Sequence, residues 1–286
     1  MSLKDAVKVV PEGSYAQIDE ETCIHYHDIG PEEGHPVLFL HGSGQGASGW
    51  SNFRHNAAAL AKRGYRSILA DMPGFGYSSK PDRLYPLSFM AGSLVKLADH
   101  LSIEAFSLVG NSMGGAGAAW IALEHPNRVK RLVLMAPGGL ESRDVYMAME
   151  GIKTMVSVTF GPDGITRKGL RRIFELQLFN PECPNGVSDA LIEERYQLSL
   201  LQIKGMVGRM RIPNLSERLS QLKTPTLAFW GHDDKFCPVS GAKILANQIP
   251  GAKVVTINAC GHWVMVEHAA MFNKMTADFL DGGYDA

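Results

Sequence analysis

Short runs of apolar residues recur along the chain and alternate with longer stretches of mixed polarity. Six runs are four residues long or slightly longer and do not alternate between polar and apolar, which is typical of strands buried on both faces of a parallel sheet. The stretches between them, such as 87–101 and 114–125, are typical of helices. This order predicts a doubly wound α/β fold, with a mostly parallel central sheet flanked by helices. The runs are residues 37–40, 67–70, 106–109, 132–135, 227–230 and 254–257.

The alternation breaks between about residues 138 and 219. This stretch is rich in Met, Arg, Glu and Leu and is typical of several helices, which Pro181, Pro184 and Gly186 interrupt. Strands resume afterwards, so we predict a helical cap (138–219) inserted into an α/β core (1–137 and 220–286). Apolar side chains of the cap form either its own core or the lining of a pocket; they include Met147, Met149, Met155, Phe160, Ile173, Phe174 and Phe179.

Composition narrows the class of protein. The chain has 286 residues, of which 45% are apolar, and it carries 28 basic and 29 acidic side chains. These values suit a packed globular fold and give no basic surface for nucleic acid. No run of 18 apolar residues exists, so we expect no membrane span, and residues 1–15 contain no signal-peptide pattern. We therefore expect a cytoplasmic protein.

The four cysteines are Cys23, Cys183, Cys237 and Cys260, which are scattered and form no CxxC pair. This spacing predicts reduced, mostly buried thiols rather than a zinc site or a disulfide framework. We expect neither a metal nor a cofactor.

The clearest chemical motif is GNSMG at residues 110–114, which matches G-x-S-x-G. It follows the run at 106–109 and precedes a helix-like stretch, which is the strand–turn–helix context of a nucleophilic serine. Gly110 and Gly114 leave room for close approach of strand and helix, and the helix N-terminus favours developing negative charge. We predict that Ser112 is the nucleophile. The simpler alternative is a glycine-rich turn without a catalytic role.

A second glycine-rich loop, HGSGQG at residues 41–46, directly follows the run at 37–40. Its backbone can present N–H groups to an oxyanion, so we predict an oxyanion hole formed by the N–H of Met113 with that of Gly42 or Ser43. A phosphate-binding loop is less consistent with the sequence, because the lysine of that motif is absent. We expect His41 to brace the loop rather than act as a base.

The general base and its acid partner should come late in the chain. In proteins that carry the serine of a G-x-S-x-G turn, the catalytic residues follow along the chain in the order Ser, then Asp or Glu, then His. His262 follows the run at 254–257, which places it at the same sheet edge as Ser112. Asp233 and Asp234 follow the preceding run. Adjacent side chains on an extended loop point in different directions, so only one of them can orient the imidazole. We predict that this is Asp234, with Asp233 as the alternative.

Together with further segments, these motifs give the chain a family resemblance. It resembles the meta-cleavage product hydrolases, the carbon–carbon bond hydrolases of aromatic degradation within the α/β-hydrolase superfamily, over nearly its whole length. The triad motifs are shared with many esterases, whereas the Asn-Ser-Met core, the PGGL and MEGIK stretches and the Gly-His-Trp loop are more specific. The resembling segments are residues 41–52, 110–115, 136–140, 149–153, 193–196, 231–238 and 261–263.

The resemblance implies a substrate class and a set of binding residues. The substrate would be a small-molecule 2-hydroxy-6-oxo-hexa-2,4-dienoate with a substituent at C6, whose C5–C6 bond is cleaved after the dienol is converted to its keto form. Asn111, Arg195 and Trp263 would bind the C1 carboxylate and the C2 oxygen, with Asn52 nearby. An arginine fork suits a carboxylate, but Arg195 could also be a solvent-exposed cap residue, and Asn111 and Trp263 could be purely structural.

One position departs from the family pattern. Gln45 stands where the pattern HGSGPG has a proline, so we expect this loop to be braced differently. The resemblance also implies a homodimer or a higher homo-oligomer. Alternatives on the same fold are a serine carboxylesterase, which needs no carboxylate-binding arginine, a cofactor-free oxygenase, and a non-catalytic ligand receptor.

Overall fold

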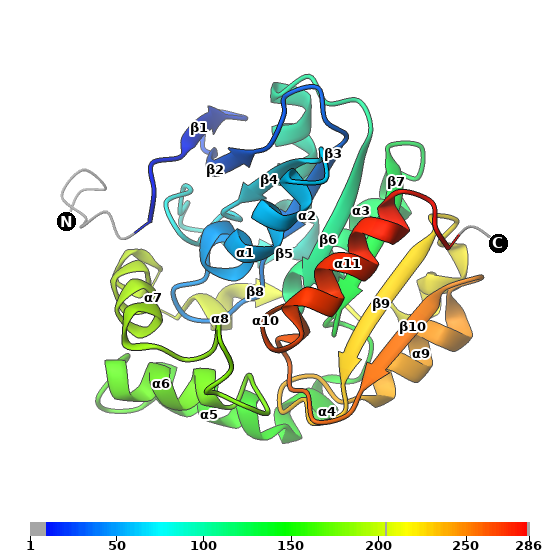
Figure 1. Ribbon diagram of the computed structural model, residues 1–286. Helices are drawn as coiled ribbons and strands as arrows, with labels where there is room; N and C mark the ends of the chain where they lie inside the picture. Colours follow the sequence, from blue (N-terminus) through cyan, green and yellow to red (C-terminus); the bar gives the residue numbers. More distant parts are fainter. Residues whose placement is uncertain (1–9, 204, 285–286) are drawn as a thin grey trace.

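The computed structural model describes residues 10–203 and 205–284 of the chain (Figure 1). Most of the N-terminal segment for which the sequence predicts no signal peptide lies outside these residues. Within the described residues, no helix is both long enough and apolar enough to cross a bilayer. An eight-stranded sheet with the order β1-β2-β4-β3-β6-β7-β9-β10 forms the centre of the molecule.

All six strands predicted from the apolar runs are present, and they pair in parallel. Along the central strand β3, Val37 and Phe39 pack into one apolar layer, and Leu38 and Leu40 pack into the layer on the opposite face. This confirms that the central strands are buried on both faces. The six strands are β3 (Pro36–Leu40), β4 (Arg66–Ala70), β6 (Phe106–Asn111), β7 (Val129–Met135), β9 (Thr226–Gly231) and β10 (Lys253–Ile257).

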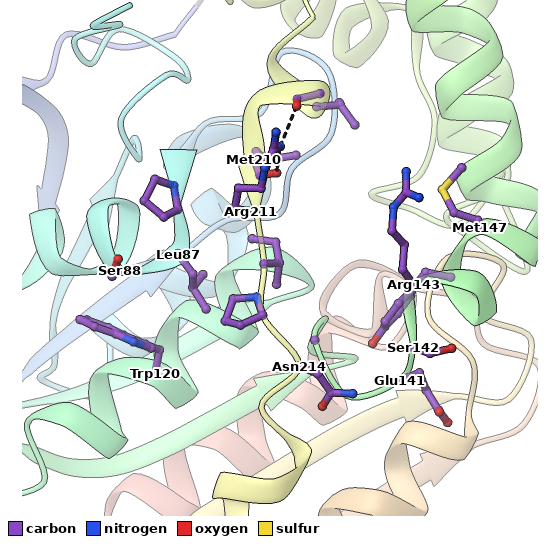
Figure 2. Close-up of a pocket in the computed structure, with 17 residues that line it drawn as sticks. Leu87, Ser88, Trp120, Glu141, Ser142, Arg143, Met147, Met210, Arg211 and Asn214 are labelled. Carbon is purple, nitrogen blue, oxygen red and sulfur yellow. Dashed lines mark hydrogen bonds between the residues drawn. The ribbon is translucent and has the colours of Figure 1, made fainter. Parts of the chain in front are cut away.

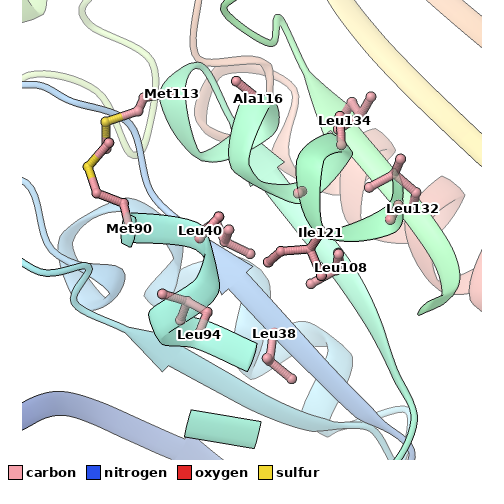
Figure 3. Packing of buried hydrophobic residues seen from close by; sticks show 14 of the residues in the cluster. Leu38, Leu40, Met90, Leu94, Leu108, Met113, Ala116, Ile121, Leu132 and Leu134 are labelled. Atoms are coloured by element: carbon pink, nitrogen blue, oxygen red, sulfur yellow. The ribbon is translucent and has the colours of Figure 1, made fainter. Parts of the chain in front are cut away.

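Helices cover both faces of the sheet. One face carries α1 (Gly49–Ala61) and α11 (Ala269–Leu280), and the other carries α2 (Leu87–His100), α3 (Met113–Glu124) and α9 (Ser240–Gln248). Figure 3 shows Leu40 and Leu108 in contact with the layer formed by α2 and α3. Each fully buried leucine contributes about 1.5–3 kcal/mol. This packing therefore fixes the relative position of β6 and α3, between which Ser112 lies.

The edges of the sheet differ from the expectation. The sequence predicts that residues 254–257 are buried on both faces, and this is wrong. β10 is an edge strand whose residues are half-buried or exposed. At the opposite edge, β1 (Ser14–Gln17) and β2 (Cys23–Ile29) form an antiparallel pair that the sequence analysis did not anticipate. An apolar run indicates a strand but does not show whether a second strand lies beside it.

The residues assigned to the cap contain several helices and a short strand. Figure 1 shows α5, α6 and α7 grouped on the side of the molecule towards which the arrowheads of β9 and β10 point. Strand β8 pairs in parallel with β5 (Tyr85–Pro86) and so joins this region to the core. The division at residues 138 and 219 stays a prediction. The elements are α4 (Arg143–Ala148), α5 (Glu150–Phe160), α6 (Arg167–Glu175), α7 (Asp189–Leu201), α8 (Met206–Arg209) and β8 (Met210–Arg211), followed by the 3-10 helix η1 (Ser216–Gln221).

Candidate active site

Ser112 is the single residue that separates β6 from α3. Its φ of 56° and ψ of −120° lie outside the usual regions for an L-residue, and such strain is typical of functional sites. The glycines around it are required by the close packing. A Cβ on Gly110 would lie 2.5 Å from the carbonyl oxygen of Gly114, and one on Gly114 would lie 2.0 Å from that of Leu40. The Ser112 N–H donates to the carbonyl of Met135 at 2.9 Å, which holds the turn in place.

His262 and Asp234 form a buried pair. Nδ1 of His262 lies 2.6 Å from Oδ2 of Asp234. The other carboxylate oxygen accepts the backbone N–H groups of Phe236 at 2.7 Å and Cys237 at 2.9 Å. A carboxylate held in this way keeps the imidazole in one tautomer, with Nδ1 protonated and Nε2 free to act as a base. Asp233, the alternative acid, is half-buried, and the imidazole Nδ1–H donates to its neighbour Asp234.

One small cavity brings most of the predicted site residues together. Asp234 lies behind His262 rather than in the lining, and Met113 is the first residue of α3, directly after Ser112. All the other residues predicted for the site line the cavity, so its walls combine a serine, an imidazole and an arginine. The lining residues are Gly42, Ser43, Gly44, Asn52, Asn111, Ser112, Ile152, Met155, Gln177, Arg195, Phe236, His262 and Trp263.

The loop at residues 41–46 approaches Ser112 closely. A Cβ on Gly42 would lie 3.4 Å from Cβ of Ser112. Met113 begins α3, so its N–H has no partner within the helix and can face an oxyanion together with N–H groups of the loop. The different bracing expected at Gln45 is present. Its side chain donates to Oγ1 of Thr159 at 2.8 Å, which ties the loop to α5.

His41 braces the same loop, as expected. The ring is fully buried, Nδ1–H donates to the carbonyl of Gly42 at 2.8 Å, and Nε2 accepts the N–H of Met72 at 3.0 Å. The bond from Met72 requires an unprotonated Nε2, so the two bonds together require the neutral imidazole. Burial lowers the pKa of His41 from 6.5 to about 4, because an imidazolium at this position would lose its hydration.

We expect acid to destabilise the fold through His41. Its folded pKa lies below its unfolded value, so the unfolded chain binds the proton first, and the stabilisation is complete above pH 6.5 and lost as the pH falls through about 4. The shift corresponds to on the order of 3 kcal/mol in the free energy of unfolding. Urea unfolding at a series of pH values measures it. His41→Gln, which cannot gain this proton, should lose less stability over that range; equal losses in the two proteins would contradict the assignment.

Arg195 of α7 is 1% exposed, so it is not the solvent-exposed residue of the alternative hypothesis. Its Nη1 donates to Ser51 Oγ at 2.8 Å and Asn52 Oδ1 at 3.0 Å, and its Nε donates to the carbonyl of Gln45 at 3.1 Å. Burial lowers the pKa of Arg195 to about 10, which leaves it charged at neutral pH. No carboxylate of the described residues forms an ion pair with it, and the adjacent Glu194 pairs with another arginine. Glu194 lies near enough to act on this cation electrostatically, but a buried cation without a direct ion pair is still unfavourable, so this guanidinium is suited to bind an anion.

Trp263 and Asn111 complete the polar side of the cavity. The Trp263 ring stacks on Phe174 with centroids 5.5 Å apart, and the Arg195 guanidinium lies 4.8 Å and 5.7 Å from the centroids of Phe174 and Trp263. Aromatic faces of this kind orient a guanidinium. Nδ2 of Asn111 donates to the carbonyl of Met135 at 3.3 Å, while its Oδ1 is buried and finds no partner in the part of the chain that the structure describes. Asn111 therefore offers an acceptor to a ligand.

Comparison with known proteins shows to which family this chain belongs. The family described as alpha/beta hydrolase fold matches residues 35–269. A 2-hydroxy-6-oxononadienedioate/2-hydroxy-6-oxononatrienedioate hydrolase of Comamonas testosteroni is 40% identical over 271 residues, which cover 91% of this chain and 92% of the relative. A 2-hydroxy-6-oxo-6-phenylhexa-2,4-dienoate hydrolase of Burkholderia cepacia is 38% identical, with coverage of 91% and 92%. The chain belongs to the meta-cleavage product hydrolases.

The meta-cleavage product hydrolases act on carbon–carbon bonds, so this chain is a hydrolase of that type. A solved structure of a meta-cleavage product hydrolase from Pseudomonas fluorescens IP01 has a TM-score of 0.78 and 28% identity to it, and the match covers 92% of this chain and 95% of that chain. The family match and this structure confirm the α/β-hydrolase fold predicted from the sequence.

Some residues of this meta-cleavage product hydrolase that line the cavity were not singled out in the sequence: Ile152, Gln177 and Phe236. Among the apolar cap residues, Met155 lines the cavity, and Ile173 and Phe174 are buried. For Phe160 and Phe179 neither expectation holds, because their side chains are 57% and 54% exposed. Met147 is 37% exposed and lines a different groove, away from Ser112.

Cys237 is a further neighbour of Ser112 that the sequence did not reveal. Its thiol lies within hydrogen-bonding reach of the Ser112 side chain. Burial, together with the nearby Asp234 carboxylate, raises the pKa of Cys237 well above its usual value, so the thiol stays protonated and does not compete as a nucleophile. Within the described part of the chain, no group of three or more His, Cys, Asp or Glu side chains could hold a metal. All four cysteines are free; Cys237 and Cys260 are buried, and Cys23 and Cys183 are half-buried.

A more spacious groove, of about 1130 Å³, lies elsewhere on the meta-cleavage product hydrolase (Figure 2). None of the Ser112, Asp234 and His262 side chains lines it. We therefore locate the chemistry in the smaller cavity, where the reactive groups converge. Figure 2 shows residues 210–214 running between two walls of this groove, one formed by Leu87, Ser88 and Trp120 and the other by Glu141, Ser142, Arg143 and Met147.

Proposed function

We propose that the enzyme cleaves the C5–C6 bond of a 2-hydroxy-6-oxo-hexa-2,4-dienoate with an apolar substituent at C6. The products are 2-hydroxypenta-2,4-dienoate and a carboxylic acid. Ser112 is the nucleophile, His262 is the general base and acid, and Asp234 orients His262. The observation that carries the proposal is the buried, unpaired guanidinium of Arg195 in the cavity of Ser112.

The polar side of the cavity supports recognition of C1 and C2. A Cβ on Gly44 would lie 3.0 Å from Nη2 of Arg195, so the guanidinium reaches the loop beside Ser112. A C1 carboxylate placed there accepts charge-assisted hydrogen bonds from the fork, for which arginine geometry is well suited. The unpaired Oδ1 of Asn111 suits the 2-hydroxyl, which is a donor. A hydrolase for small neutral esters would have no partner for this cation.

The other side of the cavity supports an apolar C6 substituent. Ile152 and Met155 of α5 and the ring of Phe236 contribute apolar surface, and the Phe236 ring centroid lies 5.4 Å from that of His262. Arg195 is the one Lys or Arg among the described lining residues. A second carboxylate at C6 would lose hydration without gaining a counter-charge, so an alkyl or aryl group is favoured over a carboxyalkyl group.

Ketonisation precedes cleavage because a carbon–carbon bond hydrolyses only when the departing carbon can carry an electron pair. The 2-hydroxyl loses its proton and C5 gains one, which converts the dienol into a 2,6-diketone with one remaining double bond. Held at C1 and C2 by Arg195 and Asn111, the substrate exchanges these protons with His262. The electron pair released later at C5 can then spread to the C2 oxygen.

Cleavage begins when Oγ of Ser112 adds to C6 and its proton passes to Nε2 of His262. The charge on the C6 oxygen is stabilised by the N–H of Met113 and that of Gly42 or Ser43. The C5–C6 bond then breaks, its electron pair moves through C4 and C3 to the C2 oxygen, and His262 returns the proton to the departing dienolate. Water hydrolyses the resulting acyl ester on Ser112, which releases the carboxylic acid.

Loss of the visible absorbance of a yellow dienolate, with identification of both products, tests the proposal. Dienoates with phenyl, alkyl and carboxyethyl groups at C6 should be turned over with the carboxyethyl compound the slowest. Hydrolysis of simple esters without turnover of any dienoate would favour the carboxylesterase. The homo-oligomer and the cytoplasmic location expected from the sequence stay predictions.

We expect Arg195→Ala to impair turnover of dienoates while small uncharged activated esters are hydrolysed at nearly the original rate. Loss of the charge-assisted bond to a buried carboxylate costs about 2–5 kcal/mol, which corresponds to a decrease in kcat/KM of roughly 30- to 5,000-fold. Only the dienoate carries that carboxylate. Steady-state kinetics with both substrate types measure the effect.

Arg167→Ala is the matched control for Arg195→Ala. Arg167 is a cap arginine whose ion pair with Glu193 is exposed, and its side chain does not line the cavity. Its replacement should change neither activity appreciably. Equal losses on dienoates and esters in Arg195→Ala would instead point to a purely structural role for Arg195.

A further inference from the structure

Gln177 is a buried polar residue that the steps above do not use. It follows α6, is 5% exposed, and lines the cavity together with Ser112 and His262. Its Oε1 is buried and has no hydrogen-bond partner among the described residues. Because buried carbonyl oxygens in folded proteins are nearly always paired, this atom is suited to accept a hydrogen bond from a molecule in the cavity.

The backbone of Gln177 is attached to the loop of the general base. Its carbonyl oxygen accepts the N–H of His262 at 2.7 Å and that of Trp263 at 3.1 Å. A Cβ on Gly261 would lie 2.5 Å from the same oxygen, so the glycine permits this close approach. The Gln177 side chain therefore extends from the backbone that positions His262, and the two backbone bonds do not depend on that side chain.

The chemistry of the reaction limits which donor can meet this acceptor. The C1 carboxylate and the C6 carbonyl of the dienoate accept hydrogen bonds, and its 2-hydroxyl has Asn111 Oδ1 as a partner. The water that hydrolyses the acyl ester is the remaining donor. It gives one proton to Nε2 of His262, and its second O–H needs an acceptor in the same cavity.

We propose that Gln177 is the second acceptor for the hydrolytic water. The inference rests on the proposed function, because it requires an acyl ester on Ser112. The water oxygen bonds to the acyl carbon, one proton passes to His262 and then to Oγ of Ser112, and the other proton stays on the acid product. Gln177 Oε1 holds that second O–H and thereby directs the oxygen lone pair at the ester.

Gln177→Leu removes the acceptor at similar size, and Gln177→Glu keeps an oxygen in its place. With the C6-phenyl dienoate, Gln177→Leu should show unchanged ketonisation and an unchanged first release of pentadienoate. Its steady-state kcat should fall roughly 10–100-fold, the loss expected for one buried hydrogen bond. The acyl ester on Ser112 should accumulate and be visible in the intact protein mass, and Gln177→Glu should recover most of the rate.

Competition between water and methanol provides a readout that a merely structural role would not change. Methanol has a single O–H, which it gives to His262, so Gln177 has no proton of methanol to accept. In dilute methanol the ratio of methyl ester to carboxylic acid should therefore rise roughly 10–100-fold from the wild-type enzyme to Gln177→Leu, as hydrolysis alone slows.

The outcomes separate this inference from the proposed function. If both proteins form methyl ester in the same ratio, Gln177 does not hold the water, and the acyl-enzyme route stands. If neither protein forms methyl ester and no acyl ester is detected, the acyl-enzyme route is wrong and the role of Gln177 falls with it. A proportional loss of ketonisation and cleavage in Gln177→Leu would also overturn the proposal.

Discussion

Replacing Ser112 with alanine should abolish carbon–carbon cleavage while the enzyme still binds dienoate. Ketonisation needs an acid–base group and a clamp at C1 and C2, and His262, Arg195 and Asn111 remain in the variant. Cleavage needs addition at C6. Loss of the nucleophile from a cooperating triad lowers the rate by on the order of 10⁶-fold, whereas loss of one oxyanion donor lowers it about 10²–10³-fold. The effect should therefore far exceed that of removing one oxyanion donor.

Stopped-flow absorbance and product analysis test this prediction. Ser112→Ala should bind the dienoate with a shifted absorbance and release almost no product. His262→Ala is the comparison, because it should be equally inactive in cleavage and should also slow ketonisation. Substantial cleavage by Ser112→Ala would show that water adds to C6 directly and that Ser112 only positions the substrate.

The second large effect is expected at Asp234. Its Oδ2 lies 2.6 Å from Nδ1 of His262, and its Oδ1 is held by two backbone N–H groups. Asn at this position can present its amide to the ring and stabilise the wrong tautomer, and it cannot balance the charge of the imidazolium. The loss in kcat should be on the order of 10⁴-fold, the size observed when the orienting carboxylate of a Ser-His-Asp triad is replaced in this way.

Asp233→Asn is a matched control for Asp234→Asn, since the two residues are adjacent and the chemical change is identical. Asp233 is half-buried, and the Nδ1–H of His262 donates to Asp234 rather than to Asp233. Its replacement should leave kcat nearly unchanged. Comparable losses in both variants would contradict the assignment, and a larger loss in Asp233→Asn would transfer the role to Asp233.

Those parts of the fold with a local pattern could be predicted from the sequence. The run at 106–109 and the glycines at 110 and 114 identified the turn of Ser112, because strand, turn and helix are adjacent in the chain. The exposure of β10 was not predictable, because it depends on which strand lies beside it. The pair β1 and β2 was missed because its strands are not continuous apolar runs.

The residues of the candidate site also fall into two groups, those that a local motif identifies and those whose position depends on packing. Ser112 and His262 stand in recognisable motifs, whereas the direction of Arg195 depends on how α7 packs. Its helix has no strongly apolar face, so periodicity could not distinguish a buried arginine from an exposed one. Gln177 is a single polar residue between Leu176 and Leu178, and no pattern indicates that its amide is buried. The resemblance suggested Arg195 but not Gln177.

Hydrogen bonds join the loop at 41–46, which lies beside Ser112, to helices α5 and α7. Gln45 donates to Thr159 at 2.8 Å, the N–H of Gly46 donates to Gln202 Oε1 at 2.9 Å, and the carbonyl of Gln45 accepts from Arg195 at 3.1 Å. A Cβ on Gly46 would lie only 2.0 Å from the Arg195 carbonyl oxygen, so loop and α7 touch through their backbones. If α7 moves to admit a substrate, it withdraws the supports from Arg195 and Gln202, and only the bond to Thr159 of α5 is independent of it. The loop beside Ser112 regains its full bracing only after α7 has returned. Closure of the cap, rather than breakage of the bond, is then a step that can limit turnover.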